Sequence, residues 1–332
     1  MDKIIIFSHE SDIDGLGSVI LGKLAFGEID YVLCPNINIL QAEFSKLIEN
    51  KNLYNYDKIY ITDLTLYAPA ADLVKNDAIL SDKVLVFDHH KSAIDDGYNT
   101  YDFENIIDVD VNDKKRCGTD LFYEYLLLEK YIVGTPAIDE FVELTRLEDT
   151  WEWKKNGRGI KAHDLAILFN VIGIEQYINI IYTKLLYESD FNFTIDEMNI
   201  IEKRKNEYLD LLKQTWEEVE FFKDESNNKY ASLYANYELR NELSEYAKSL
   251  KIDGLKYLII VALEKGEFGQ KSYRSIEENF DVGKIAKSHG GNGHAGAAAV
   301  NITEEQRNHA LSLMRTNKRD SLKYLVDNNY TD

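Results

Sequence analysis

Short apolar runs alternate with amphipathic stretches in the first third of the chain. Runs rich in β-branched residues at 3–7, 58–62 and 83–87 are each followed by a polar cluster and then by helix-like sequence. Helical spacing at 16–26 and 41–49 supplies the crossovers that parallel strands require. The pattern predicts an α/β fold with a parallel sheet, and ligands of such sheets gather beyond the carboxyl ends of the strands.

The rest of the chain predicts further helices and a second domain. Apolar positions recur at helical spacing over 118–131 and 137–147. A capping box at 194–197 opens a long periodic stretch that reaches Val219, and a polar turn at 224–229 follows it. A buried strand is expected at 257–263. We therefore expect a parallel-sheet domain at 1–190, a linker helix at 191–228 and a smaller α/β domain at 229–332.

Charge and cysteine content narrow the classes of protein. The chain has 332 residues, with 38 Lys and Arg against 58 Asp and Glu, for a net charge of −20. This balance argues against an extended basic track for long nucleic acid, so an anionic substrate should be short. Cys34 and Cys117 lie far apart without CxxC spacing, which fits a reducing compartment. With no apolar segment resembling a leader or a membrane span at the N-terminus, we expect a cytoplasmic protein without a membrane partner.

The polar segment 8–15, at the end of the first predicted strand, carries candidate metal ligands. His9, Asp12 and Asp14 place one imidazole and two carboxylates on a tight turn that Gly15 permits. This mixed N/O donor set suits Mn²⁺ or a comparable divalent ion. For this motif alone, a polar loop in which an aspartate caps the next helix is an equally good interpretation.

Two further strand ends carry the same kinds of side chain. Asp63 follows the second run, and Asp88, His89 and His90 follow the third. Each could be a strand-end cap, but three successive strand ends deliver them to one edge of the sheet. So many acids in one cleft need cations, and two metal ions about 3.5–4 Å apart that share a carboxylate satisfy this need. Asp149 is the candidate for a further ligand. Its neighbour Glu148, or a solvent-facing role for Asp149, stays open.

The C-terminal part holds a glycine-rich segment at 290–298. Small residues there let backbone N–H groups approach a phosphate, with His294 as a side-chain contact. Upstream, Arg274 could pair with a phosphate in bidentate fashion. A glycine-rich stretch is weak evidence by itself, and a surface arginine on a strand is the alternative for Arg274.

Together these motifs resemble the DHH phosphoesterase family, named for the Asp-His-His that is residues 88–90 here. Residues 8–15 are similar to its first motif, Asp63 to its second and Asp149 to its fourth. Residues 290–298 are similar to the glycine–histidine motif of the DHH-associated C-terminal domain. Among the branches of the family, the chain looks most similar to the nanoRNase/oligoribonuclease type. Asn292 interrupts the usual run of glycines and Ala299 replaces another, which affects how a phosphate or base fits.

The resemblance implies a role for each matching residue. One metal ion would be held by His9, Asp12 and Asp63, and the other by Asp14, Asp63, His89 and Asp149. The catalytic residues would be Asp63 as the bridging ligand, Asp88 as a partner that orients a ligand, and His90 facing the scissile phosphate. The substrate would be bound by His90, Arg274, His294 and the backbone of Gly291 and Gly293.

The activity that follows is a two-metal phosphodiesterase that cleaves short RNA or dinucleotides to nucleoside 5′-monophosphates. Cyclic dinucleotides, cyclic mononucleotides, 3′-phosphoadenosine 5′-phosphate and pyrophosphate or polyphosphate are alternative substrates, and a non-catalytic nucleotide sensor is the alternative class. Mn²⁺ is the expected ion, with Mg²⁺, Co²⁺ or Fe²⁺ as alternatives. Cleavage polarity and oligomeric state have no marker in the sequence.

Overall fold

The chain forms two compact units, Met1–Arg204 and Lys205–Asp332, called here the N-terminal and C-terminal units. The computed structural model describes residues 2–95, 101–154 and 159–327. The division between the units falls within one helix, α10 (Ile195–Trp216).

The N-terminal unit has five strands, β1 (Ile4–His9), β2 (Asp30–Cys34), β3 (Lys58–Thr62), β4 (Val84–Asp88) and β5 (Glu104–Ile106). Its helices are α1 (Ile13–Phe26), α2 (Ile37–Glu49), α3 (Ala70–Asn76), α4 (Ala78–Ser81), α5 (Lys91–Asp95), α6 (Gly118–Leu128), α7 (Pro136–Asp149), α8 (Gly159–Ile172) and α9 (Ile174–Tyr187), with short 3-10 turns η1 (Leu53–Asn55) and η3 (Glu152–Lys154).

These strands form one parallel sheet in the order β2-β1-β3-β4-β5. The three apolar runs of the sequence are β1, β3 and β4, so the prediction of an α/β fold with a parallel sheet is confirmed. Because all five strands run the same way, their carboxyl ends share one edge, and that edge is where the candidate site lies.

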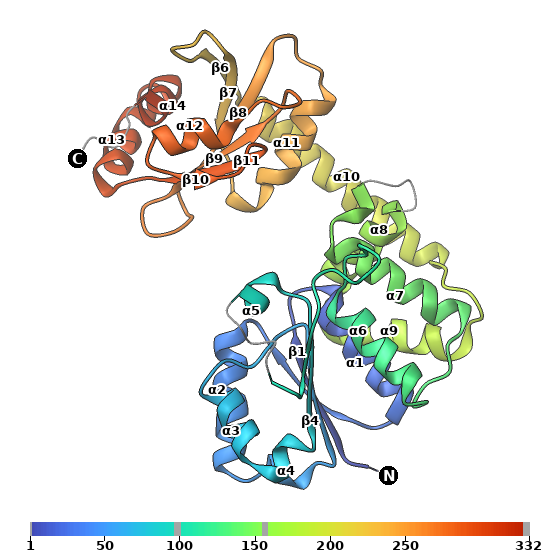
Figure 1. Ribbon diagram of the computed structural model, residues 1–332. Coiled ribbons are helices and arrows are strands. Elements are labelled where there is room, and N and C mark those ends of the chain that lie inside the picture. Colours follow the sequence, from blue (N-terminus) through green and yellow to red (C-terminus); the bar gives the residue numbers. More distant parts are fainter. Residues whose placement is uncertain (1, 96–100, 155–158, 328–332) are drawn as a thin grey trace. The chain divides into compact units, whose positions relative to one another are not determined.

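Alternate residues of β1 belong to different cores, as expected for a strand covered on both faces. Ile4 and Ile6 pack with α1, α6 and α7. Ile5 and Phe7 pack with α2, α3 and α4. Figure 1 shows α2, α3 and α4 on one side of this sheet and α1, α6, α7 and α9 on the other. All four strand residues are at most 2% exposed, which fixes the strand and the loop that follows it.

The C-terminal unit has six strands, β6 (Glu220–Lys223), β7 (Lys229–Tyr234), β8 (Leu255–Ala262), β9 (Gln270–Ser275), β10 (Asn292–Gly293) and β11 (Ala297–Asn301). Its helices are the end of α10, α11 (Arg240–Ser249), α12 (Val282–Ser288), α13 (Glu304–Met314) and α14 (Lys318–Asp327), with the 3-10 turn η4 (Tyr237–Leu239).

The second sheet is mixed, in the order β10-β11-β9-β8-β7-β6, with β7 and β8 parallel and the other neighbours antiparallel. Its central strand β8 is the buried strand expected at 257–263. Tyr257 and Ile259 pack toward α12 and α14, whereas Leu258 and Ile260 pack toward α10 and α11. Strand β6 lies in the range expected to be linker, and helical periodicity did not predict it. No helix among the described residues has both the length and the apolarity to span a membrane.

Candidate metal centre and substrate contacts

Three strands of the first sheet end in side chains that can bind metal. β1 ends at His9, Asp63 follows β3, and β4 ends at Asp88. Asp63 has a left-handed backbone (φ 55°), which aspartate tolerates better than most residues, and its N–H donates to the Phe87 carbonyl at 2.9 Å. This bond extends the pairing of β3 with β4 by one residue and holds Asp63 over the edge of the sheet.

The first group of candidate ligands is His9, Asp12 and Asp63, whose ligand atoms all lie within 4.8 Å of one another. His9 Nδ1 is 2.7 Å from Asp12 Oδ2 and 3.6 Å from Asp63 Oδ2. Asp12 is also the N-cap of α1, because its carboxylate accepts from the Gly15 N–H at 3.1 Å. The helix-cap and ligand interpretations of the first motif are therefore compatible.

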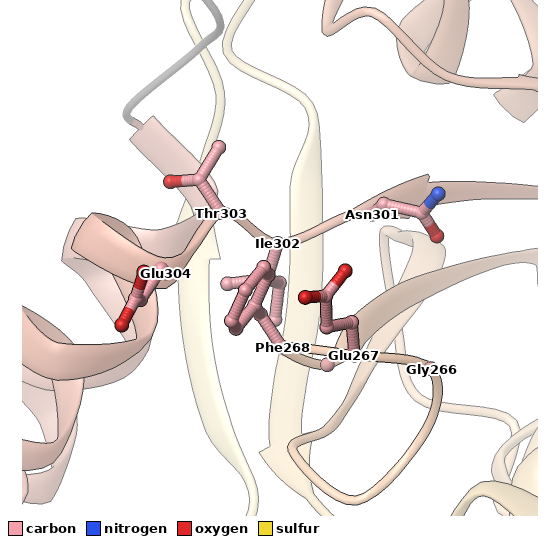
Figure 2. A pocket seen from close by; sticks show the side chains of 8 residues that line it. Gly266, Glu267, Phe268, Asn301, Ile302, Thr303 and Glu304 are labelled. Atoms are coloured by element: carbon pink, nitrogen blue, oxygen red, sulfur yellow. The ribbon is translucent and has the colours of Figure 1, made fainter.

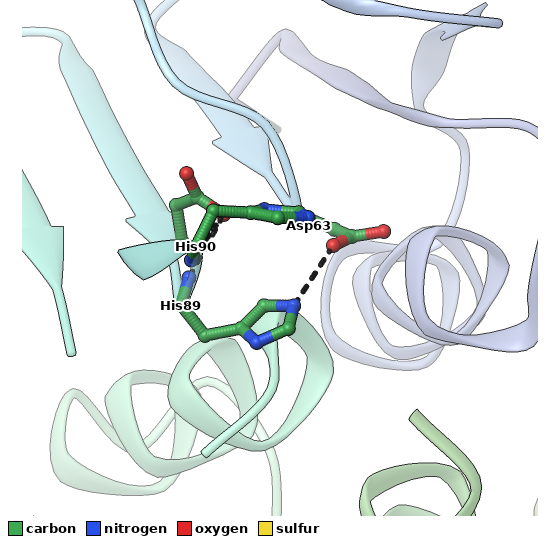
Figure 3. A group of neighbouring side chains, drawn as sticks. Asp63, His89 and His90 are labelled. Atoms are coloured by element: carbon green, nitrogen blue, oxygen red, sulfur yellow. Dashed lines mark hydrogen bonds and ion pairs between the residues drawn. The ribbon is translucent and has the colours of Figure 1, made fainter. Parts of the chain in front are cut away.

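The second group is Asp14, His89 and Asp149, again with ligand atoms within 4.8 Å. His89 Nε2 is 3.8 Å from Asp14 Oδ2 and 3.4 Å from Asp149 Oδ2. It is also 3.3 Å from Asp63 Oδ1, so Asp63 lies between the two groups. Figure 3 shows the His89 imidazole directed at the Asp63 carboxylate.

Asp88 and His90 form a pair beside these groups. His90 Nδ1 is 2.7 Å from Asp88 Oδ1, and the same oxygen accepts from the His89 N–H at 2.8 Å. Asp88 is almost fully buried whereas half of the His90 side chain is exposed. The buried carboxylate thus sets the orientation of the ring, and the outer part of the ring is accessible.

The donor set fits divalent metal ions. Asp63 Oδ2, His89 Nε2 and Asp149 Oδ2 are buried and form no hydrogen bond among the described residues. Buried polar atoms are normally hydrogen-bonded, and these atoms instead lie in ion-pair contacts of 3.3–3.8 Å around His89 Nε2 and of 3.6 Å between Asp63 Oδ2 and His9 Nδ1, a spacing that leaves their lone pairs free for a metal ion. Imidazole and carboxylate donors at one point are what a divalent transition metal binds. Their arrangement as two adjacent groups joined by Asp63 suits a pair of ions.

The pKa values of the metal-free cluster show how strongly its groups interact. Burial, reinforced by Asp14, raises the pKa of Asp63 to about 7, and burial raises that of Asp149 to about 8. The hydrogen bond to Asp12 raises the pKa of His9 to about 10. Burial alone would lower the pKa of His89, but the surrounding carboxylates raise it to about 10. Cations, whether protons or metals, are thus held tightly here.

Helix α6 completes the centre in a way that the sequence analysis missed. The Asp14 carboxylate accepts from the backbone N–H groups of Gly118 and Thr119, each at 2.7 Å, and so caps the N-terminus of α6. A Cβ at Gly118 would lie 2.6 Å from the backbone nitrogen of Asp63, so only glycine permits this approach. Both contacts join segments that are distant in sequence, so no local sequence pattern predicts them.

The structure also distinguishes Asp149 from its neighbour. Asp149, the last residue of α7, faces His89. Glu148 instead contacts His163, with 3.1 Å between Glu148 Oε1 and His163 Nδ1. Of the two acids that the sequence left open, Asp149 is the one in the cluster.

In the C-terminal unit Arg274 lies on β9, opposite Ala297 of β11 and therefore beside the glycine-rich segment. It is half-buried: Nη1 donates to the Tyr273 carbonyl at 2.9 Å, and Nη2 donates to Asn241 Oδ1 at 3.3 Å. Burial and the nearby Arg240 lower the pKa of its guanidinium. It is thus a fixed cation on a strand rather than a freely mobile surface arginine.

The glycine-rich segment is shaped by its backbone. A Cβ at Gly291 would come 2.2 Å from the Ala299 carbonyl oxygen, and Gly293 has φ 145°. The His294 N–H donates to the Ala297 carbonyl at 2.8 Å, and its side chain is exposed. Asn292, which interrupts the glycines of this segment, pairs with Ala299 in the β10–β11 ladder.

A separate hollow in this unit is lined by 266–269 and 301–304, shown in Figure 2. Its charged lining residues are Glu267 and Glu304, and its lining holds no Lys, Arg or His. An anionic substrate would be repelled there, so the hollow is not a candidate for phosphate binding.

The metal-ligand groups at the carboxyl edge of the first sheet and the matches to known proteins together place the chain among metal-dependent phosphoric ester hydrolases. Residues 3–145, within the N-terminal unit, match the model of the DHH family, N-terminal domain. The chain is 29% identical over 307 residues to the oligoribonuclease NrnB of Bacillus subtilis (strain 168), a match covering 90% of this chain and 73% of that protein.

Two solved structures share the fold over nearly the whole chain. One is the pGpG-specific phosphodiesterase PggH from Vibrio cholerae, with a TM-score of 0.52 and 15% identity, covering 95% of this chain and 98% of that one. The other is the DHH domain of a member of the S1p family of ribosomal proteins, with a TM-score of 0.54 and 15% identity, covering 99% and 88%. At this identity the similarity concerns the fold.

Proposed function

We propose that the protein is a two-metal phosphodiesterase that hydrolyses short oligoribonucleotides, including dinucleotides, to nucleoside 5′-monophosphates. The observation that carries the proposal is the junction of two histidine–carboxylate groups at Asp63, with buried ligand atoms that form no hydrogen bond among the described residues. Such a pair of sites is the arrangement used for in-line displacement at phosphorus.

The nature of the relatives supports this choice of substrate. The relative at 29% identity is named an oligoribonuclease, and a structural neighbour is named for a linear dinucleotide, pGpG. The net charge of −20 adds a physical reason for a short substrate, because a long polyanion would be repelled by the acidic surface.

Each residue of the cluster has a distinct role in this proposal. One ion is held by His9, Asp12 and Asp63, and the other by Asp14, Asp63, His89 and Asp149. When bound, the ions supply Lewis acidity toward the phosphate oxygens and activate the attacking water. Mixed imidazole and carboxylate donors favour Mn²⁺.

His90 and the C-terminal unit act on the substrate. Asp88 holds Nδ1 of His90, so the exposed Nε2 edge is directed outward to contact the scissile phosphate or to give a proton to the leaving oxygen. Arg274 and His294 bind a terminal phosphate or sugar of the substrate. The backbone N–H groups of Gly291 and Gly293, which the sequence analysis assigned to substrate, instead donate to the Ala286 carbonyl and to Asn292 Oδ1, each at 2.8 Å. We place this activity in the cytoplasm, with which the two free, buried cysteines agree.

Product analysis tests the proposal. Purified protein in Mn²⁺ is incubated with an RNA length ladder from dinucleotide upward, with pGpG, cyclic di-AMP and 3′-phosphoadenosine 5′-phosphate in parallel. We expect the shortest oligomers to yield 5′-monophosphates fastest and EDTA to abolish the reaction. Cleavage of only a cyclic dinucleotide or of 3′-phosphoadenosine 5′-phosphate would refute the substrate, and no turnover of any compound would favour the nucleotide sensor.

A further inference from the structure

An exposed tryptophan follows the candidate metal ligand Asp149 by two residues. Helix α7 ends at Asp149, and Trp151 follows two residues later. The backbone N–H of Trp151 donates to the Glu148 carbonyl at 3.1 Å. About half of the Trp151 residue is exposed (53%). Trp151 is therefore two residues along the chain from a candidate metal ligand, and its side chain is open to solvent.

The backbone at Trp151 is unfavourable for a large side chain. Its φ is 60°, the left-handed conformation that usually follows a helix and is usually occupied by glycine. A bulky residue with positive φ is an outlier, and such outliers concentrate at functional sites. Lys51, Lys130 and Lys251 adopt the same conformation after α2, α6 and α11, so what distinguishes Trp151 is the large, exposed apolar side chain at such a helix end.

The neighbouring Trp153 has a different environment, which makes it a useful contrast. Its ring stacks on His163 with the centroids 4.2 Å apart and the planes at 11°, and His163 in turn contacts Glu148. Trp153 is half-buried and supports the loop. Among the described residues, Trp151 has no such aromatic partner.

A cation accompanies the exposed indole. Lys154 Nζ lies 4.6 Å from the centroid of the Trp151 ring and 5.4 Å from that of the Trp153 ring. Lys154 is exposed, and no ion pair with a carboxylate is formed by it among the described residues. An aromatic face with an uncompensated positive charge beside it is the combination that binds single-stranded nucleotides.

We propose that Trp151 stacks on a nucleobase adjacent to the scissile phosphate, and that Lys154 contacts a flanking phosphate. This inference rests on the proposed function and names the subsite that recognises the substrate's base. Stacking is tolerant of base identity because every base has a π-face, so this subsite selects nucleotides over base-free phosphodiesters without selecting one sequence.

Tryptophan fluorescence tests the contact independently of turnover. The chain has three tryptophans, Trp151, Trp153 and Trp216. We expect titration with 5′-AMP, a product that is not hydrolysed, to quench the wild type and W216F, and W151F to lose the quenching. Equal quenching in W151F would overturn the proposal. This readout needs no catalysis, so it distinguishes failure of the stacking contact from failure of the proposed function.

Kinetics with a dinucleotide supply the second test. W151A should raise KM about tenfold while kcat changes less than about twofold, and W151F should remain within about threefold of the wild type. A dinucleotide that lacks one base should narrow the difference between W151A and wild type. W151G is a second variant that relieves the positive φ, so it should fold at least as well as wild type and show the same KM increase. Unchanged KM in a folded W151G would overturn the proposal.

Discussion

The two sets of candidate residues are built by different means. At the edge of the first sheet, side chains from the ends of β1, β3 and β4 and from α1 and α7 converge, and His89 Nε2 lies 3.3–3.8 Å from three carboxylates. In the C-terminal unit the glycine-rich segment is defined by close backbone contacts, and the one histidine in it is exposed.

The difference shows which groups each region depends on: charged side chains in the first and the backbone in the second. The first region concentrates charge in a buried place, a costly arrangement that cations offset. The second keeps its side chains small so that its backbone can form close internal contacts, such as the Gly291 N–H with the Ala286 carbonyl and the His294 N–H with the Ala297 carbonyl. Substitution of one side chain should therefore abolish the chemistry in the first region, but only weaken binding in the second.

Asp63→Asn, in the first region, should have the largest effect on activity. Loss of the carboxylate between the two groups should lower kcat for Mn²⁺-dependent dinucleotide hydrolysis by more than about 100-fold, since even indirect partners of metal ligands are worth 10–100-fold. The matched control is Asp57→Asn, an exposed aspartate that precedes β3 at the opposite end of the strand and should keep wild-type activity. Full activity of D63N would eliminate the shared-ligand mechanism.

Arg274→Ala should act on binding instead. Removal of a guanidinium that pairs with phosphate should lower kcat/KM by about 10- to 100-fold, mostly through KM, because charged hydrogen bonds contribute about 1.5–3 kcal/mol. Arg274→Lys should recover part of this loss, as it keeps the charge without the fork. Arg315→Ala, at an exposed arginine after α13, serves as the control. A fall in kcat with unchanged KM would assign Arg274 to the chemistry.

The pH dependence of metal binding probes the first region alone. Asp63 and Asp149 have folded pKa values of about 7 and 8, above the unfolded value, so in metal-free protein they reduce the unfolding free energy as pH rises from 4 through 8. His9 and His89, with pKa values of about 10, contribute stability below pH 6.5 that is lost toward pH 10.

Because metal must displace these protons, Mn²⁺ affinity should rise with pH, about tenfold per unit where one proton is released. Calorimetric titration at pH 6, 7 and 8 measures it, and the increase in Tm caused by Mn²⁺ should be larger at pH 8 than at pH 6. Affinity independent of pH would contradict the protonated cluster. The D63N variant should show a shallower slope.

His294→Ala should have the smallest effect. The side chain is exposed and the turn is held by its backbone, so the unfolding free energy should change by less than about 0.5 kcal/mol. KM for a dinucleotide should rise severalfold if the imidazole contacts substrate. Urea denaturation and initial-rate kinetics measure the two effects, and a large loss of stability would show that the second region also depends on side chains.

Local patterns predicted the first sheet well because the same short segments contain the strands and, directly after them, the candidate metal ligands. The runs that became β1, β3 and β4 are nearly continuous apolar sequence, and the parallel rule alone places Asp63 beside His9 and His89. The same patterns did not predict β2, which is only partly buried, or β6, which lies directly after a long helix.

The features of the site that could not be predicted from the sequence depend on contacts between distant segments of the chain. Nothing near Asp14 indicates that its carboxylate accepts from Gly118 and Thr119, which lie 104 and 105 residues away. The choice between Glu148 and Asp149 likewise depends on how α7 rotates against the sheet, which spacing alone does not determine. Metal identity and the roles of the individual ligands stay predictions.

The contact of Asp14 with α6 also sets an order of events during synthesis. A nascent chain that has emerged as far as Ile106 contains every strand of the first sheet, yet it lacks the backbone donors that fix Asp14 and it lacks Asp149. The centre is completed only when α6 and α7 have left the ribosome and docked. A chain that ends before α6 therefore lacks part of the centre and also the helices that cover one face of the sheet, so the scaffold and the metal site are completed together.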